Sequence, residues 1–224
     1  MDADERSYEA DAWNMRELEE LMSLEYEGAT ELLLVRHGKP AEGGSVTSGL
    51  GVEGRDQVEA LAHQLSAGWV ESIYCAPEAV ALQTAQVLAG RLGRPFEKLP
   101  DLRDVESQPF LDGGMRRCVV PTLAELFDRR PRWDSLPGFE CSRDFRRRSI
   151  QIVEAIVGQH PGRRVVVVTH ASVINAYLSM VLDIPRDLFF APAYASVSAV
   201  RSYRDHHAVR SLNDTSHLHE RSAA

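Results

Sequence analysis

The stretch Leu32-Leu33-Leu34-Val35-Arg36-His37-Gly38 contains the residues that decide the fold of this chain. Consecutive large apolar residues in so short a run are typical of a β-strand that is buried on both faces. We therefore predict a strand over 31–36, and the glycine that follows allows the chain to turn sharply at the strand end. This prediction places Arg36 and His37 at the carboxyl end of a buried strand.

Downstream of this stretch, segments with helical spacing alternate with short apolar runs. The spacing of apolar residues predicts helices over 53–67, 78–91, 142–158 and 171–182. Apolar or alternating runs predict strands over 70–75, 96–99, 164–169, 195–203 and 208–212. One more helix is expected over 122–129, inside an irregular stretch from 100 to 138. The alternation predicts an α/β fold, a three-layer α/β/α sandwich with a mostly parallel central sheet.

The composition is that of a soluble globular protein. Of the 224 residues, 44% are hydrophobic and 26% are charged. The aliphatic runs 32–35 and 165–168 are too short to cross a bilayer, and the acidic N-terminus lacks the apolar core of a secretory signal. Three widely spaced cysteines form neither a disulfide framework nor a zinc-site pattern. We therefore expect a cytoplasmic protein with no membrane association and no bound metal.

The negative charge of the chain is concentrated at its N-terminus. Residues 1–30 contain ten acidic and two basic residues, whereas residues 31–224 contain 23 of each. We interpret 1–30 as an acidic arm with a short helix over 10–27, 31–218 as the main domain and 219–224 as a tail. The main domain has no excess of basic residues, so binding of nucleic acid is not expected.

Two histidines follow predicted buried strands, His37 after the first and His170 after the strand over 164–169. Ligands of such sheets bind beyond the carboxyl ends of the strands. A neutral imidazole is a competent nucleophile towards phosphorus, and Arg36 together with a protonated His170 would bind the phosphoryl oxygens. The residues alone also fit a second interpretation, in which each histidine is only a satisfied polar group at a strand end.

Phosphoryl transfer also needs an acid that protonates the leaving oxygen. The irregular stretch offers four carboxyl groups for this role, those of Asp101, Asp104, Glu106 and Asp112.

The stretch 33–38 resembles the signature of the histidine phosphatase superfamily, also called the phosphoglycerate mutase-like family. Further segments resemble motifs of that family and occur in the family's order. They are Leu50 through Gly54-Arg55-Asp56-Gln57, Gln83-Thr84-Ala85, Leu102-Arg103-Asp104, Gly138-Phe139-Glu140-Cys141, Val167-Val168-Thr169-His170 and Asn213-Asp214-Thr215-Ser216-His217-Leu218. The resemblance covers about residues 31–218.

The resemblance implies a phosphoglycerate mutase-like fold and a phosphatase that acts on a small phosphorylated metabolite. His37 would form a phosphohistidine that water then hydrolyses, without metal or organic cofactor. Asp104 would be the acid, with Glu106 second in line, and His170 the third catalytic residue. The implied substrate-binding residues are Arg36, Gly38, Arg103 and Ala171.

The chain departs from the family's pattern in three places. Val80 stands where most members have a second phosphate-binding arginine, Asp104 replaces glutamate, and Ala171 replaces glycine. The candidates to replace the missing arginine are Arg103, Arg116, Arg117 and Lys39. The departures leave a second hypothesis, a weak or inactive member that binds a phospho-ligand or acts in regulation. Phosphoglycerate mutase is a third, and the sequence identifies neither the substrate nor whether the protein forms a homodimer.

Overall fold

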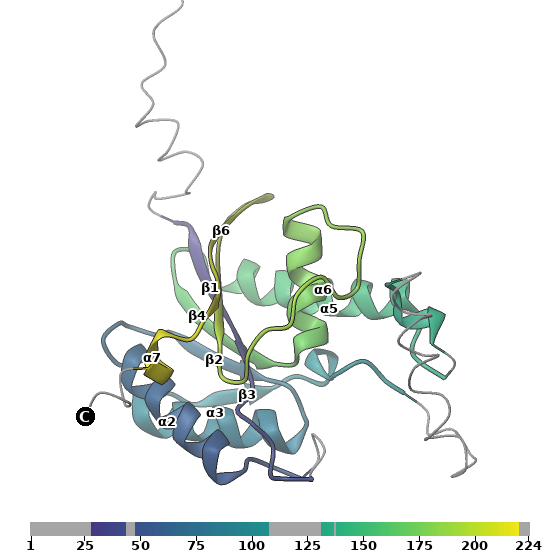
Figure 1. The fold of residues 1–224 in the computed structure, drawn as a ribbon. Helices are drawn as coiled ribbons and strands as arrows, with labels where there is room; N and C mark the ends of the chain where they lie inside the picture. Colours follow the sequence, from purple (N-terminus) through teal and green to yellow (C-terminus); the bar gives the residue numbers. More distant parts are fainter. Residues whose placement is uncertain (1–27, 44–47, 108–130, 137, 220–224) are drawn as a thin grey trace, which may run out of the picture.

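The structure is a computed structural model that describes residues 28–43, 48–107, 131–136 and 138–219. Its strands are β1 Thr30–Arg36, β2 Ser72–Cys75, β3 Phe96–Lys98, β4 Arg164–Thr169, β5 Val197–Tyr203 and β6 His206–Asp214. They form one six-stranded sheet in the order β3-β2-β4-β1-β5-β6 (Figure 1). Strands β1 to β4 run parallel, whereas β5 runs antiparallel to both of its neighbours. The mostly parallel sheet predicted from the sequence is thus confirmed.

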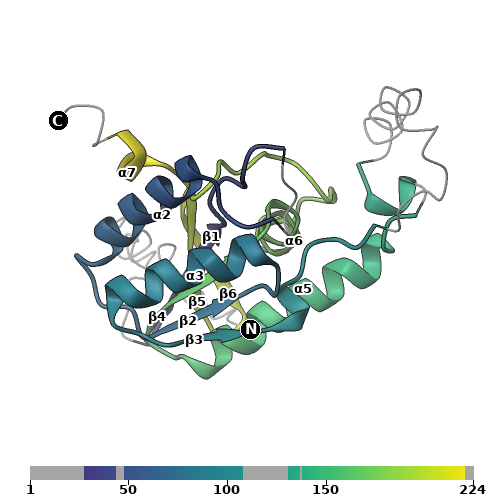
Figure 2. The ribbon, with the colours of Figure 1, turned by 90° about the horizontal axis from the view of Figure 1, so that it is seen from below.

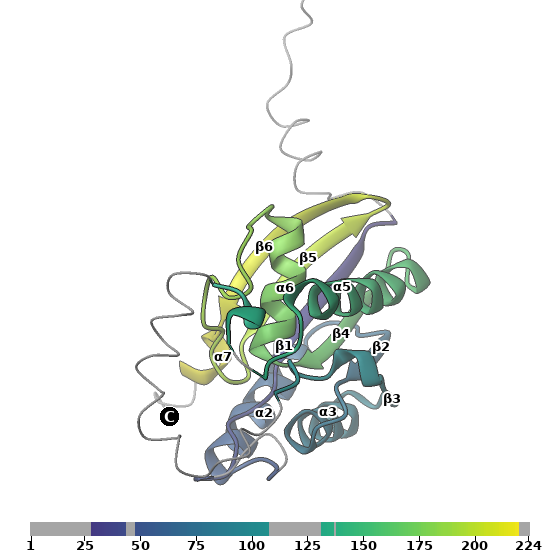
Figure 3. The same ribbon diagram turned by 90° about the vertical axis from the view of Figure 1, so that its right-hand side faces the viewer.

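Helices cover both faces of this sheet. They are α2 Val52–Leu65, α3 Ala79–Leu92, α5 Ser142–Gln159, α6 Ala171–Val181 and the short α7 Ser216–His219, with 3₁₀ turns η1 Pro100–Leu102 and η2 Trp133–Ser135. Helices α2 and α3 pack together on one side, and α5 packs with α6 on the other (Figures 2 and 3). The division follows the order of the strands, because α2 and α3 lie on the path outward from β1 to β3 and α5 lies on the path back to β4.

Most element boundaries agree with the sequence prediction to within two residues. The final hairpin is longer than expected, because β6 extends over the whole of His206–Asp214. The helices expected over 10–27 and 122–129 lie outside the described residues. Within the described ranges, none of the helices combines the length and hydrophobicity needed to cross a bilayer.

The centre of the core is formed by the two neighbouring strands β1 and β4. Their aliphatic side chains, Leu32 to Val35 and Val165 to Val168, are at most 2% exposed. Arg36 pairs with Thr169 in the register of the two strands, and the backbone N–H of His37 donates to the Thr169 carbonyl at 3.0 Å. Both strands therefore end at the same level, and the residues that follow them emerge side by side at the carboxyl edge of the sheet.

Glycine is required where the turn after β1 meets the first turn of α2. A Cβ atom on Gly38 would lie 2.7 Å from the carbonyl oxygen of Gly54 and 2.8 Å from Cγ2 of Val58. A Cβ atom on Gly54 would lie 2.0 Å from the carbonyl oxygen of Lys39. Real Cβ atoms do not approach backbone oxygens so closely, so these two glycines let the turn pack directly against α2.

Candidate active site

His37 is buried at the end of β1 and has a defined hydrogen-bonding pattern. Its side chain is 3% exposed, and its Nδ1 lies 2.8 Å from the carbonyl oxygen of Gly38. A carbonyl can only accept, so Nδ1 carries the proton and the lone pair is on Nε2. Burial, reinforced by the neighbouring His170, lowers the pKa of His37 to about 3. At neutral pH the ring is therefore an uncharged imidazole with a nucleophilic Nε2.

His170 lies at the N-terminus of α6, directly before Ala171, and faces His37. The two ring centroids are 5.0 Å apart, and the side chain of His170 is 1% exposed. Its Nε2 is 2.8 Å from Oε2 of Glu78, and its Nδ1 is 3.6 Å from Oδ2 of Asp104. His170 is thus held between two carboxyl groups, and in its protonated form it presents an N–H towards each of them.

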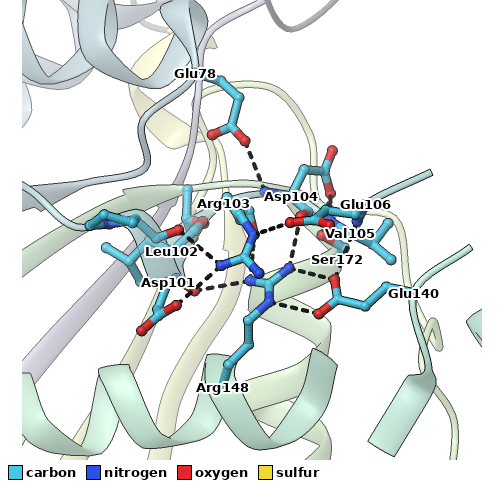
Figure 4. Close-up of polar contacts among 12 residues, drawn as sticks. Glu78, Asp101, Leu102, Arg103, Asp104, Val105, Glu106, Glu140, Arg148 and Ser172 are labelled. Carbon is cyan, nitrogen blue, oxygen red and sulfur yellow. Dashed lines mark hydrogen bonds and ion pairs between the residues drawn. The ribbon is translucent and has the colours of Figure 1, made fainter. Parts of the chain in front are cut away.

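Asp104 lies just after η1, with its carboxyl group near His170. Oδ1 accepts hydrogen bonds from the hydroxyl of Ser172 and from the backbone N–H of Val105, the latter at 2.8 Å (Figure 4). Oδ2 is the oxygen nearer His170. Glu106 instead accepts from Nε of Arg103 at 2.6 Å and has an exposed side chain. Of the acids in this segment that the sequence analysis singled out and the structure describes, Asp104 is the one beside the histidines.

Arg148 on α5 holds the segment that carries Asp104. Its guanidinium donates to the carbonyl oxygens of Asp101, Arg103 and Asp104 at 2.9 to 3.0 Å (Figure 4). It also forms a two-pronged ion pair with Glu140, at 2.7 and 2.9 Å. One side chain therefore fixes the backbone on both sides of Leu102, which brings the carboxyl group of Asp104 to the sheet edge.

We expect Arg148→Ala to destabilise the protein by about 3 kcal/mol, because the change leaves Glu140 and three carbonyl groups without their donor in a largely buried place. Chemical denaturation measures the difference in the free energy of unfolding. Arg147→Ala is the matched control on the same helix. Arg147 pairs with Asp144 on an exposed face, so its loss should cost at most about 0.5 kcal/mol. Equal effects of the two changes would contradict the role given to Arg148.

Arg36 supplies a positive charge next to the two histidines. Its guanidinium donates to the carbonyl oxygen of Pro192 at 2.5 Å and lies 3.9 Å from the centroid of the Tyr194 ring. Burial lowers the pKa of Arg36, although an arginine remains protonated at any physiological pH. The ring of Tyr194 also lies 5.7 Å from that of His37. Tyr194 thus orients both residues of the Arg-His pair, a role that the sequence analysis missed.

Helix α3 ties the turn that follows β1 to the rest of the site. The hydroxyl of Thr84 accepts from the backbone N–H of Gly38 at 3.1 Å and donates to the carbonyl oxygen of Val80 at 2.7 Å. Gln83 accepts from the backbone N–H of Leu50 at 2.8 Å. The Gln83-Thr84 pair therefore anchors the loops around His37. The side chain of Val80 is completely buried.

Two of the residues proposed to replace the family's second arginine form ion pairs with other side chains. Arg103 pairs with Asp101 and Glu106, and Lys39 pairs with Glu53 at 2.5 Å. The other two candidates from the sequence analysis, Arg116 and Arg117, lie outside the described residues. In the part of the chain that the structure describes, Arg36 is thus the arginine that lies against His37.

The chain is similar to several solved structures over most of its length. YhfR from Bacillus stearothermophilus is 26% identical with a TM-score of 0.72, and the match covers 85% of this chain and 100% of that one. A phosphoglycerate mutase from Bacillus anthracis is 19% identical with a TM-score of 0.73, covering 87% and 97%. A phosphoserine phosphatase from Entamoeba histolytica, in complex with phosphoserine, is 20% identical with a TM-score of 0.68, covering 84% and 99%.

A comparison with curated protein sequences finds no significant match. The family model of the histidine phosphatase superfamily (branch 1), however, matches residues 32–215. This range includes both histidines at the sheet edge, Asp104 and the anchoring pair on α3. The chain therefore belongs to the histidine phosphatase superfamily, branch 1.

Proposed function

We propose that this protein is a phosphatase that hydrolyses a small phosphorylated metabolite through a phosphohistidine on His37. The observation that carries the proposal is the buried, uncharged ring of His37. Its Nδ1 is committed to the Gly38 carbonyl, which leaves Nε2 free for attack on phosphorus. Its neighbours Arg36 and His170 provide the positive charge and the N–H donor that a transferring phosphoryl group requires.

In the first step, Nε2 of His37 attacks phosphorus and the bond to the ester oxygen breaks. Asp104, in its protonated form, gives its proton to that oxygen as the alcohol leaves. In the second step, Asp104 takes a proton from a water molecule, which attacks the phosphohistidine and releases inorganic phosphate. Arg36, His170 and the backbone N–H of Ala171 hold the phosphoryl oxygens through both steps. The backbone of Gly38 is not available for this role, because its carbonyl already accepts from His37 and its N–H already donates to Thr84.

Trapping the covalent intermediate tests this proposal. The protein is mixed with a phosphoester radiolabelled in its phosphoryl group and quenched in alkali, in which phosphohistidine is stable. We expect the label on the peptide that contains His37, together with release of inorganic phosphate from members of a phosphometabolite panel. Phosphate release without labelled protein at any quench time would contradict the covalent route.

A phospho-ligand-binding protein with weak or no turnover is the second candidate. Two observations favour it: the buried apolar Val80, and the carboxyl group of Glu78 beside His170. Both reduce the positive charge available to a phosphoryl group. This candidate predicts saturable binding of phosphate without product release, so the same labelling experiment and a binding titration distinguish it from the phosphatase.

A further inference from the structure

The carboxyl group of Glu78 lies beside His170, and its position is not explained by a role in α3, the helix that follows it. Glu78 is the residue that precedes α3, yet its side chain makes no capping hydrogen bond to that helix. It extends instead to two other segments. Oε2 accepts from Nε2 of His170 at 2.8 Å, and Oε1 accepts from the backbone N–H of Asp104 at 3.2 Å. Glu78 thus connects the second histidine with the segment that carries the acid.

Glu78 is ionised in this place. Its side chain is 17% exposed, and burial alone would raise its pKa. The hydrogen bond and the charge of His170, together with hydrogen bonds from the backbone of Glu78 and Asp104, outweigh burial, so the pKa of Glu78 lies below its ordinary value. An ionised carboxylate has about four lone-pair positions, and the hydrogen bonds with His170, with Asp104 and with its own backbone N–H do not use all of them. The remaining positions can accept further hydrogen bonds from a ligand bound next to His170.

The interaction of a bound oxyanion with this carboxylate depends on whether the oxyanion carries a proton. A fully ionised oxyanion has only acceptor oxygens, so its approach to Glu78 brings like charges together with no hydrogen bond between them. A phosphoryl group that keeps one P–OH donates that proton to the carboxylate instead, in a short charge-assisted hydrogen bond. Val80 on α3 is uncharged where the family's pattern has a second arginine, so this position supplies no cation that offsets the repulsion.

We propose that Glu78 is a specificity-determining residue that makes the site select monoanionic phosphoryl groups, those with one P–OH, over fully ionised oxyanions. The inference rests on the phosphatase function proposed above and adds to it the charge state of the substrate. In the selected complex, the P–OH donates to an oxygen of Glu78. Arg36 and His170 bind the other phosphoryl oxygens.

The test compares phosphate with sulfate, which has the same shape but carries no proton near neutral pH. Dissociation constants of both ions are measured by titration calorimetry at about pH 6.5, where each phosphate ion carries at least one P–OH and sulfate carries none. We expect the wild-type protein to bind phosphate at least about tenfold more tightly than sulfate. Glu78→Gln, which removes the charge at nearly constant shape, should bind sulfate at least about tenfold more tightly than the wild type and lose most of the preference.

Two further variants make the result specific. Glu78→Ala removes the carboxylate without adding an amide donor, so sulfate affinity should again rise, by less than in the glutamine variant. Glu59→Gln removes one carboxylate from the exposed face of α2 and should leave the ratio of the two affinities unchanged. Thermal unfolding of each variant shows that the comparison is made on folded protein.

Two results would overturn the inference. If both Glu78 variants lose affinity for the two ions equally, or keep the wild-type ratio, Glu78 only supports His170. If the wild type binds neither ion while the variants bind both, Glu78 blocks the site rather than selecting its ligand. Neither measurement depends on turnover. Failure to trap a phosphohistidine therefore refutes the covalent route and leaves this test standing.

Discussion

His37→Asn is expected to reduce the turnover of phosphomonoesters by about 10⁴-fold or more while the protein keeps its fold. The loss is large because the variant has no atom that can form the covalent intermediate. The fold should survive because the side chain of His37 makes its hydrogen bond locally, to the carbonyl of the next residue. Steady-state kinetics measures the loss of turnover, and circular dichroism checks that the fold is kept.

His63→Asn is the control for this change. His63 lies on the exposed face of α2, so replacing it should change neither turnover nor stability beyond about 0.5 kcal/mol. If the His37 variant retained activity within about tenfold of the wild type, the phosphohistidine mechanism would be ruled out.

Asp104→Asn should reduce the rate of hydrolysis most for substrates whose leaving group needs a proton most. Asparagine keeps the shape of the side chain and still accepts from Ser172 and Val105, but it cannot donate an acidic proton. We expect kcat/KM to fall by about 10² to 10⁴ for alkyl phosphates and by less than about tenfold for p-nitrophenyl phosphate, whose leaving group is already stable as an anion. The measurement is kcat/KM for a series of phosphoesters with leaving groups of increasing pKa.

Glu106→Gln is the matched control for the acid. Because Glu106 is exposed and paired with Arg103, its replacement should affect both substrate classes alike and only slightly. Equal losses on alkyl and aryl phosphates in the Asp104 variant would remove Asp104 from the role. A selective loss in the Glu106 variant would assign the role to Glu106.

The placement of the two histidines was predictable from the sequence because it depends on strong local signals. The runs 32–35 and 165–168 leave little choice but strands buried on both faces, and each run ends at a residue pair that contains histidine. The sequence alone did not indicate that β1 and β4 are direct neighbours in matched register. That pairing turns two separate strand ends into a single site.

Other parts of the site depend on contacts that no local pattern indicates. From the sequence, Glu78 is predicted to begin a helix, and no residue near it indicates that its side chain contacts His170. Tyr194 lies in an irregular segment without periodicity, so its contact with Arg36 had no signal at all. For Arg103 a signal existed. Its spacing from Glu106 is that of a local ion pair, which the structure contains and which competes with the substrate-binding role implied by the resemblance.

The pairing of β1 with β4 also makes the candidate site depend on the folding of a long part of the domain. His37 comes near the beginning of the described chain, and α2, β2, α3, β3, α5 and β4 all lie between it and His170. Contacts between such distant segments form late, because the entropy of closing the long loop must be overcome first. A partly folded chain, even one with its local helices in place, would hold two separate histidines and no assembled site. Assembly of the candidate site and pairing of β4 with β1 are thus one event.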